Sequence, residues 1–333
     1  MTMILGIEST AHTFGIGIVQ NGKILANVRD MIKTDSGGII PMESAKHHKK
    51  IAEEVYKKAL ERANVKEEDI DSIALSNAPG LAPCLLTGME FAKKKALDLN
   101  KKIIPVNHCI AHLEIGQSVG ASDSVLLYAS GANTQIIAYA SGKYRVFGET
   151  LDLGIGNFID KIARYFGLGF PGGPKIEELA KKSKTEDYIE LPYSIKGMDV
   201  SFSGMQTKIQ QLYDKSADKK KAKQDLSFSL QETAFSMLIE AAERALAHTG
   251  KTELVLGGGV ACNQRFQKMC KIMCKERKSK FFCPEKSLLV DNAAMIAYTG
   301  ELMYNKDKSL ALDADKVDIE PRERTDQVNV SWR

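Results

Sequence analysis

The chain has 333 residues, of which 44% are hydrophobic and 26% are charged, and its formal net charge is +4. This globular composition leaves room for two domains, and it excludes a transmembrane helix because no apolar run approaches about 18 residues. The first ten residues carry neither a basic region nor a small-residue cleavage site, so we expect no signal peptide. Six scattered cysteines without a C-x-x-C pair favour reduced thiols in a cytoplasmic protein over a disulfide framework.

The N-terminal part of the sequence predicts strands followed by a helix. Residues 1–31 predict three strands, because apolar or alternating stretches are separated by tight turns and "NG" at 21–22 is a strong hairpin signal. Residues 41–63 have helical spacing of apolar side chains. Residues 70–80 then predict a strand that ends in a Gly/Pro turn.

The same order of elements returns about 120 residues later. Residues 124–150 predict three more strands, and a helical stretch, a short apolar strand at 252–256 and another helix follow. Strand–strand–strand–helix–strand therefore occurs twice, which indicates a duplicated α/β architecture with two mixed sheets facing a cleft. Turns at residues 8–15 and 130–135 could direct backbone N–H groups at phosphate from both sides. This organisation is typical of actin-like, sugar-kinase and Hsp70-type nucleotide-binding proteins.

The two repeats suggest a division of the chain into lobes. We expect an N-terminal lobe of residues 1–118, completed by about 300–333, and a C-terminal lobe of residues 119–299 with inserted loops. Residues 168–205 are predicted as long loops. The lysine-rich run at 214–224 is more typical of a solvated helix face than of a polyanion contact.

His108 and His112 are spaced so that both lie on one helix face, where they could bind a single metal ion. The apolar strand directly before them places the pair at the carboxyl edge of a sheet, where sites of open α/β proteins lie. The alternative is a pair of hydrogen-bonded core histidines. Asp291 is a candidate third ligand, although it could simply cap a helix, and Tyr128 could add a phenolate. Spacing alone does not choose between Asp291, Asp160 and the other histidines.

Several motifs, taken together, resemble one family over essentially the whole chain. In order, they are "GIESTAHTFGIGIV", "NHCIAHLEIG", "YASGANTQ", "FIDKIARYFGLGFPGGPKIEELA", "SFSGMQTK", "LGGGVACNQR" and "VDNAAMIA", with "PRERTDQVNVSW" at the end. They resemble the universal tRNA threonylcarbamoyladenosine synthase family, in its archaeal and eukaryotic branch, which is the catalytic subunit of KEOPS. Proteins of this family were formerly described as O-sialoglycoprotein endopeptidases.

The resemblance implies an actin-like (ASKHA) fold of two RNase H-like lobes around a nucleotide cleft. It implies transfer of threonylcarbamoyl from threonylcarbamoyl-AMP to the exocyclic amine of an anticodon-loop adenosine in tRNA. It also implies one divalent metal ion per subunit, iron or alternatively zinc, with His108, His112 and Asp291 as ligands and Tyr128 as a fourth.

The resemblance further implies a site for an adenine nucleotide, which could also be ATP or AMP. Its phosphate loop would consist of Tyr128, Ala129, Ser130, Gly131 and Ala132, and its other nucleotide-binding residues would be Asp160, Gly173, Glu177 and Asn263. Glu8 is a candidate catalytic residue that would orient the incoming amine, and its alternative is a strand-end carboxylate that binds a backbone N–H.

The implied partners are tRNA, a kinase-like subunit that could be fused in the full gene, and a small dimerising subunit. No membrane association is expected. Ala82, Leu86, Ala132 and Ala293 depart from the family pattern, and Ala132 could misdirect a backbone N–H if its position requires positive φ. Three alternatives are an actin-like ATP-dependent kinase, a non-catalytic nucleotide-binding partner and a metalloprotease, which the missing glutamate after His108 disfavours.

Overall fold

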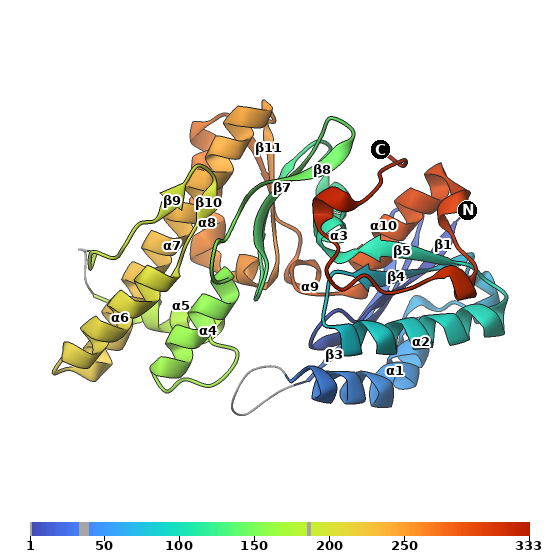
Figure 1. Cartoon of the computed structure of the whole chain (residues 1–333), viewed down its shortest axis with the longest axis horizontal. Helices are drawn as coiled ribbons and strands as arrows, with labels where there is room; N and C mark the ends of the chain where they lie inside the picture. Colours follow the sequence, from blue (N-terminus) through green and yellow to red (C-terminus); the bar gives the residue numbers. More distant parts are fainter. Residues whose placement is uncertain (1, 33–39, 185–187) are drawn as a thin grey trace.

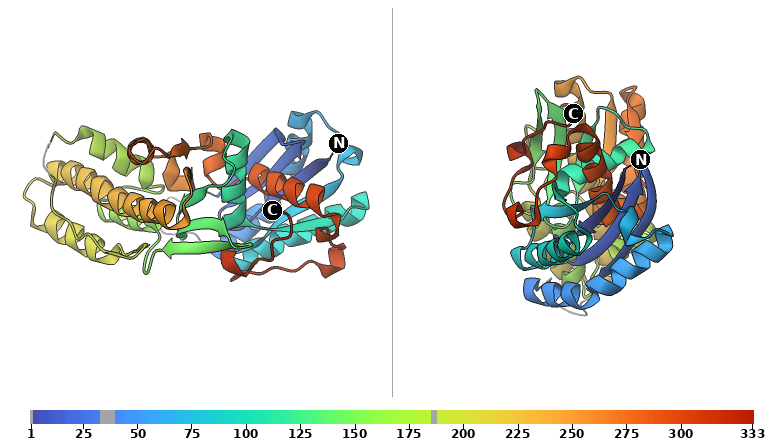
Figure 2. Two further views of the ribbon diagram at one scale, coloured as in Figure 1. Left: turned by 90° about the horizontal axis from the view of Figure 1, so that it is seen from above. Right: turned by 90° about the vertical axis from the view of Figure 1, so that its right-hand side faces the viewer.

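The computed structural model describes residues 2–32, 40–184 and 188–333. Two five-stranded mixed sheets dominate it, and they lie side by side in two lobes (Figures 1 and 2). The first has the order β3-β2-β1-β4-β5, with β1 (Met3–Glu8), β2 (Thr13–Gln20), β3 (Lys23–Met31), β4 (Ser72–Ala78) and β5 (Ile103–Asn107). The second has the order β12-β11-β6-β7-β8, with β6 (Val125–Ala129), β7 (Thr134–Ala140), β8 (Lys143–Glu149), β11 (Glu253–Gly257) and β12 (Lys280–Phe282).

The two sheets repeat one topology, which confirms the duplication predicted from the sequence. In each, three antiparallel strands are followed by two parallel ones. The second and third strands of each half also share a register shift, between Ile18 and Val19 in one sheet and between Ile136 and Ile137 in the other. The "NG" turn has φ of 51° at Asn21 and 75° at Gly22, as a two-residue hairpin with positive φ at both positions requires.

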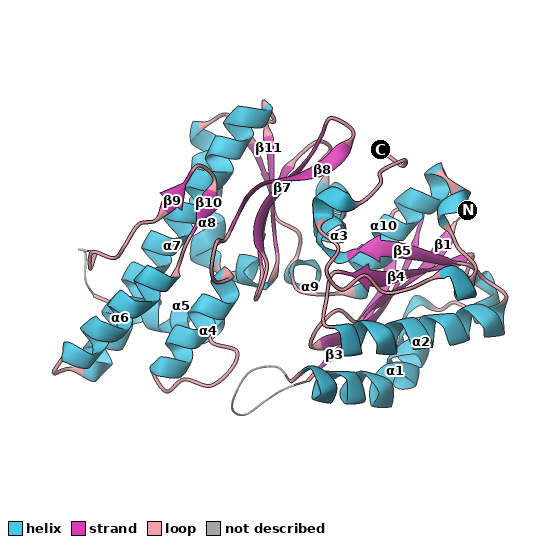
Figure 3. Cartoon of the chain, in the orientation of Figure 1, coloured by secondary structure: helices cyan, strands magenta, loops and turns pink. Residues whose placement is uncertain are grey.

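Helices cover both faces of the first sheet (Figure 3). Helices α1 (Pro41–Ala63) and α2 (Ala82–Leu99) pack on one face, and α10 (Ala293–Lys306) packs on the other. The approach of α10 is close, because a Cβ built on Gly6 would lie 2.4 Å from the carbonyl oxygen of Ala293. Glycine in β1 therefore lets the amino end of α10 reach the sheet. We propose that the N-terminal lobe is completed from residue 293 rather than from about 300.

The second lobe carries a further set of helices, one of them 31 residues long. They are α4 (Ile155–Tyr165), α5 (Gly173–Lys182), α6 (Ser203–Lys215), α7 (Lys219–Thr249), α8 (Gln264–Glu276) and the short α9 (Lys286–Leu289). The prediction of long loops at 168–205 is wrong in part, since α5 and a ribbon of β9 (Ile195–Lys196) and β10 (Asp199–Val200) lie there. Ile176 and Ala180, one turn apart, bury the inner face of α5. The lysine-rich run opens α7 with exposed side chains, as predicted.

Short elements complete the chain. Helix α3 (His108–Glu114) follows β5 directly and lies between the sheets in Figure 1. The 3-10 turns are η1 (Glu67–Asp69), η2 (Ile115–Val119), η3 (Gly259–Cys262), η4 (Lys308–Leu310), η5 (Ala314–Lys316) and η6 (Thr325–Gln327). Within the described ranges, no helix is both long and apolar enough to cross a membrane.

Candidate active site

Two buried histidines lie where β5 ends and α3 begins. His108 is the first residue of α3, and His112 follows one turn later with its ring centroid 4.9 Å away. The helix starts here because Asn107 caps it, its side-chain oxygen accepting the N–H groups of Cys109 (3.0 Å) and Ile110 (3.3 Å). Both imidazoles are thereby held between the two sheets, at the carboxyl edge of the first.

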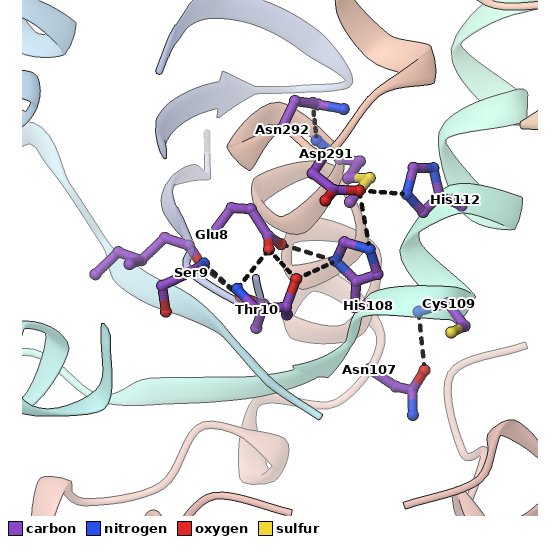
Figure 4. A network of polar contacts seen from close by, with 12 residues as sticks. Glu8, Ser9, Thr10, Asn107, His108, Cys109, His112, Asp291 and Asn292 are labelled. Atoms are coloured by element: carbon purple, nitrogen blue, oxygen red, sulfur yellow. Dashed lines mark hydrogen bonds and ion pairs between the residues drawn. The ribbon is translucent and has the colours of Figure 1, made fainter. Parts of the chain in front are cut away.

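Asp291 and Tyr128 face this pair from other elements (Figure 4 shows the aspartate). Asp291 Oδ1 lies 3.3 Å from His108 Nε2 and 3.6 Å from His112 Nε2. The hydroxyl of Tyr128, on β6, lies 3.2 Å from His108 Nε2. The nitrogen and oxygen atoms that the two histidines and Asp291 could offer to a metal all lie within 4.8 Å of one another. In the part of the chain that the structure describes, no other group of three or more His, Cys, Asp or Glu side chains is as close.

Asp291 is free for this arrangement because its neighbour caps the helix. Asn292 is the N-cap of α10, and its side-chain oxygen accepts the N–H of Met295 at 3.0 Å. Its amide nitrogen donates to the carbonyl groups of Leu288 and Val290. The alternative in which Asp291 serves only as a helix cap is therefore wrong.

The residues present fit a divalent cation. Both ring nitrogens of His112 are buried and, among the described residues, make no hydrogen bond within 3.5 Å, since Asp291 Oδ1 stays 3.6 Å from Nε2. Such nitrogens are costly unless another group satisfies them. Burial lowers the pKa of His112, so its imidazole is neutral, which is the form that binds a metal. Burial also opposes protonation of His108, but the charges of Glu8 and Asp291 raise its pKa well above the usual value. The surroundings therefore favour positive charge.

Glu8 lies beside His108 and approaches Nδ1, whereas Asp291 approaches Nε2 of the same ring (Figure 4). His108 Nδ1 donates to Glu8 Oε2 at 2.9 Å, and the backbone N–H and hydroxyl of Thr10 donate to Oε1. Glu8 is completely buried. The geometry therefore favours a carboxylate that orients a metal-binding histidine and holds a backbone N–H, rather than one that contacts an incoming amine.

The loop after β6 is braced by the start of α4. The N–H groups of Gly156 and Asn157 donate to the carbonyl groups of Ser130 (3.0 Å) and Gly131 (2.9 Å). Neither Gly131 nor Ala132 has positive φ. Ala132 therefore adopts its position without strain, and the departure from Gly-Gly does not misdirect the loop.

The other candidate nucleotide residues lie on three elements of the second lobe. Asp160, on α4, accepts the N–H of Gly172 at 2.7 Å, directly before Gly173 at the start of α5. Burial raises the pKa of Asp160. The structure brings Glu177 and Asn263 to adjacent positions, because Glu177 Oε1 accepts the N–H of residue 264 at 3.3 Å.

Asn263 has a structural role of its own. It caps α8 by accepting the N–H of Phe266 at 3.1 Å, and its amide nitrogen donates to Gln231.

The remaining departures from the family pattern are accommodated. Ala293 is fully buried, and its methyl group would be in ordinary van der Waals contact, at 3.4 Å, with a Cβ built on Gly15 of β2. Ala82 is the first residue of α2, and Leu86 is 41% exposed on the same helix.

Sequence reasoning missed Thr10, Asn107 and Asn292. Asparagine directly before α3 and directly before α10 was the available signal for the two caps.

Two duplicated lobes with a candidate metal centre between them define an actin-like α/β protein, and known structures share this fold. HypF of T. kodakarensis superposes with a TM-score of 0.64 at 13% identity, over 90% of this chain and 47% of that one. The activator of the 2-hydroxyisocaproyl-CoA dehydratase from Clostridium difficile gives 0.50 at 14% identity, over 92% and 97% of the two chains. At such identities the likeness concerns the fold alone.

Relatives by sequence are much more similar. The family described as tRNA N6-adenosine threonylcarbamoyltransferase (TsaD) matches residues 23–298. The protein of that name from Thermococcus kodakarensis is 53% identical over 98% of this chain and 99% of its own length. A probable bifunctional tRNA threonylcarbamoyladenosine biosynthesis protein of Methanosarcina acetivorans is 51% identical over 99% of this chain and 60% of its own length. The chain belongs to the tRNA N6-adenosine threonylcarbamoyltransferase family, and it is a transferase that modifies adenosine in tRNA. The resemblance inferred from the motifs is confirmed.

Proposed function

We propose that the chain transfers threonylcarbamoyl from threonylcarbamoyl-AMP to the exocyclic amine of an anticodon-loop adenosine. The donor is an activated mixed anhydride, so the protein mainly has to position the reactants and stabilise charge on the leaving phosphate. The observation that carries the proposal is the placement of Tyr128. Its hydroxyl faces His108, and its strand leads directly into the loop at 130–132.

We propose that His108, His112, Asp291 and Tyr128 hold one metal ion per subunit. Two imidazoles, a carboxylate and a phenolate suit iron, with zinc as the alternative, better than magnesium. A divalent cation bound there supplies a Lewis acid close to the phosphate of the donor. Glu8 and Thr10 fix the ring of His108, and Asn107 and Asn292 fix the elements that carry the ligands.

The nucleotide part of the donor is assigned to the second lobe. Backbone N–H groups of residues 128–132 face the phosphate, and Asp160 and Glu177 accept the ribose hydroxyls. Gly173 leaves open space, since a Cβ there would meet nothing within 4 Å. Asn263 completes the pocket, and ATP or AMP would occupy the same place.

The tRNA is held outside the cleft and only weakly by this chain alone, because a net charge of +4 neutralises few phosphates. We propose that a kinase-like subunit and a small dimerising subunit of KEOPS extend the binding surface, in the cytoplasm. The longer bifunctional relatives support a second module joined to this one.

A single-turnover assay with labelled threonylcarbamoyl-AMP and tRNA tests the transfer. Glu177→Ala is expected to weaken nucleotide binding by about 1–3 kcal/mol, the value of a hydrogen bond to a charged group, while metal content stays unchanged. Transfer to tRNA that lacks the anticodon-loop adenosine would contradict the assignment of the acceptor.

A further inference from the structure

We propose that residues 318–333, which we call the strap, clamp α3 at both ends and thereby set the positions of His108 and His112. This inference rests on the proposed metal site. The strap follows the last helices of the N-terminal lobe and runs, in dark red, past β4 and β5 to the side of β8 (Figure 1). Its residues belong to neither sheet of the fold.

The strap is first fixed along the carboxyl end of β4. The N–H of Glu320 donates to the carbonyl of Asn77 at 2.9 Å, and the Asn77 amide donates to the carbonyl of Asp318 at 3.2 Å. The N–H of Gly80 donates to the carbonyl of Pro321 at 3.2 Å. These contacts define where Glu323, two residues after Pro321, stands relative to β5.

Glu323 binds Asn107, the residue that caps the start of α3. The side-chain amide of Asn107 donates to Glu323 Oε2 at 2.9 Å, while its oxygen caps the helix at Cys109 and Ile110. An asparagine amide can turn end for end, and the cap requires its oxygen to face the helix. The carboxylate, which only accepts hydrogen bonds, selects that orientation. His108 follows Asn107 directly, so Glu323 acts on the first candidate ligand through one residue.

Arg333 holds the other end of the helix. Glu114, the last residue of α3, is completely buried, and its Oε1 lies 3.0 Å from both Nε and Nη2 of Arg333. The hydroxyl of Tyr144, on β8, donates to the same oxygen at 2.6 Å. A buried carboxylate needs such partners, because an unpaired charge is costly in the interior. The contact therefore fixes α3 two residues after His112.

The strap also contacts the second lobe. Arg324 Nη2 lies 3.2 Å from Oε1 of Glu149 on β8. The guanidinium of Arg333 lies 5.1 Å from the ring centre of Tyr139 on β7. The histidine-bearing helix is thus joined by one segment to the sheet that carries Tyr128. Glu323 and Arg333 are positioning residues, since neither is a candidate metal ligand and each acts on α3 through another residue.

Zinc affinity, measured by competition with a chelating dye, tests the clamp. Glu323→Ala is expected to lower affinity about tenfold, the lower end of the effect of residues that orient metal ligands. Asn107→Asp keeps the capping oxygen but places its carboxylate against that of Glu323. It is therefore expected to lower zinc affinity by a similar factor. Adding Glu323→Gln to Asn107→Asp restores the bond with donor and acceptor exchanged and should recover most of the loss.

The matched control is Arg324→Ala, in the same segment, which removes a contact to β8 without touching α3 and should leave zinc affinity unchanged. Arg333→Met, which keeps the apolar stem, should lower zinc affinity as Glu323→Ala does. Wild-type affinity in both Glu323→Ala and Asn107→Asp, or no recovery in the double variant, would overturn the clamp.

If the wild-type chain binds no zinc and no iron, the metal site itself fails. Hydrogen exchange of the Cys109 and Ile110 amides in metal-free protein then tests the clamp. The clamp requires these amides to exchange faster in Glu323→Ala than in the wild type, and equal exchange rates would overturn it.

Discussion

Glu8 and His108 stand 100 positions apart in the chain, and the carboxylate of one accepts a hydrogen bond of 2.9 Å from the ring of the other. The bond fixes a proton on Nδ1 and leaves Nε2 facing Asp291. This relationship separates two roles for Glu8, because a carboxylate that already accepts hydrogen bonds from His108 and Thr10 is placed to orient the histidine.

The first prediction follows from that bond. Glu8→Ala should lower metal affinity about 10- to 100-fold, because residues that orient metal-binding histidines have effects of that size. Titration with zinc, followed by competition with a dye, measures it. Wild-type metal affinity combined with lost transfer would return Glu8 to the role of contacting the amine.

The second prediction separates the helix cap from the candidate ligand. Asn292→Ala should lower the free energy of unfolding by about 1 kcal/mol or more, because it removes the cap of α10 and leaves buried carbonyl groups without a donor. Asp291→Ala should abolish metal binding while retaining the cap. Urea unfolding of Asn292→Ala and zinc titration of both variants make the comparison, and wild-type zinc affinity in Asp291→Ala would contradict the assignment.

The third prediction concerns Ala132. Because this residue does not require positive φ, Ala132→Gly should lower the free energy of unfolding by about 0.4–1 kcal/mol through the greater entropy of the unfolded chain. Nucleotide affinity, measured by calorimetry, should not increase. A gain in affinity would indicate that the alanine does misdirect the loop.

The fourth prediction concerns pH. Burial lowers the pKa of His48 from 6.5 to about 4, so between these values the unfolded chain binds more protons than the folded one. The contribution of His48 to the free energy of unfolding is therefore fully present above pH 6.5. It falls by up to about 3 kcal/mol as the pH drops to 4. His48→Gln should lose this part of the pH dependence, while His248→Gln, at an exposed histidine of α7, serves as the control. Parallel pH curves for wild type and His48→Gln would be inconsistent with a neutral buried His48.

Local patterns were sufficient to predict the sheets. Alternating hydrophobicity marks each strand and the Asn21-Gly22 turn marks a hairpin, and both are visible within short stretches. The same order of strands and helices in the second half then indicated a second sheet. The helix at 173–182 was missed because two glycines and a proline at its start resemble a loop, although Ile176 and Ala180 already indicated a buried face.

The candidate site could be predicted only as a set of residue types. Spacing placed His108 and His112 on one face, but Asp291 comes from a segment 179 positions after His112, and only the packing of α10 on β1 brings it there. The partners of Glu8, Glu323 and Arg333 likewise depend on the paths of distant segments. No short-range pattern of the sequence records them.

The most direct test of the account is the metal content of the chain purified without added metal, measured by elemental analysis. The wild-type protein should carry one equivalent of iron or zinc per chain. His112→Ala should carry almost none and should transfer no threonylcarbamoyl group, while His47→Ala should retain both. A full equivalent of metal in His112→Ala would contradict the assignment of the site.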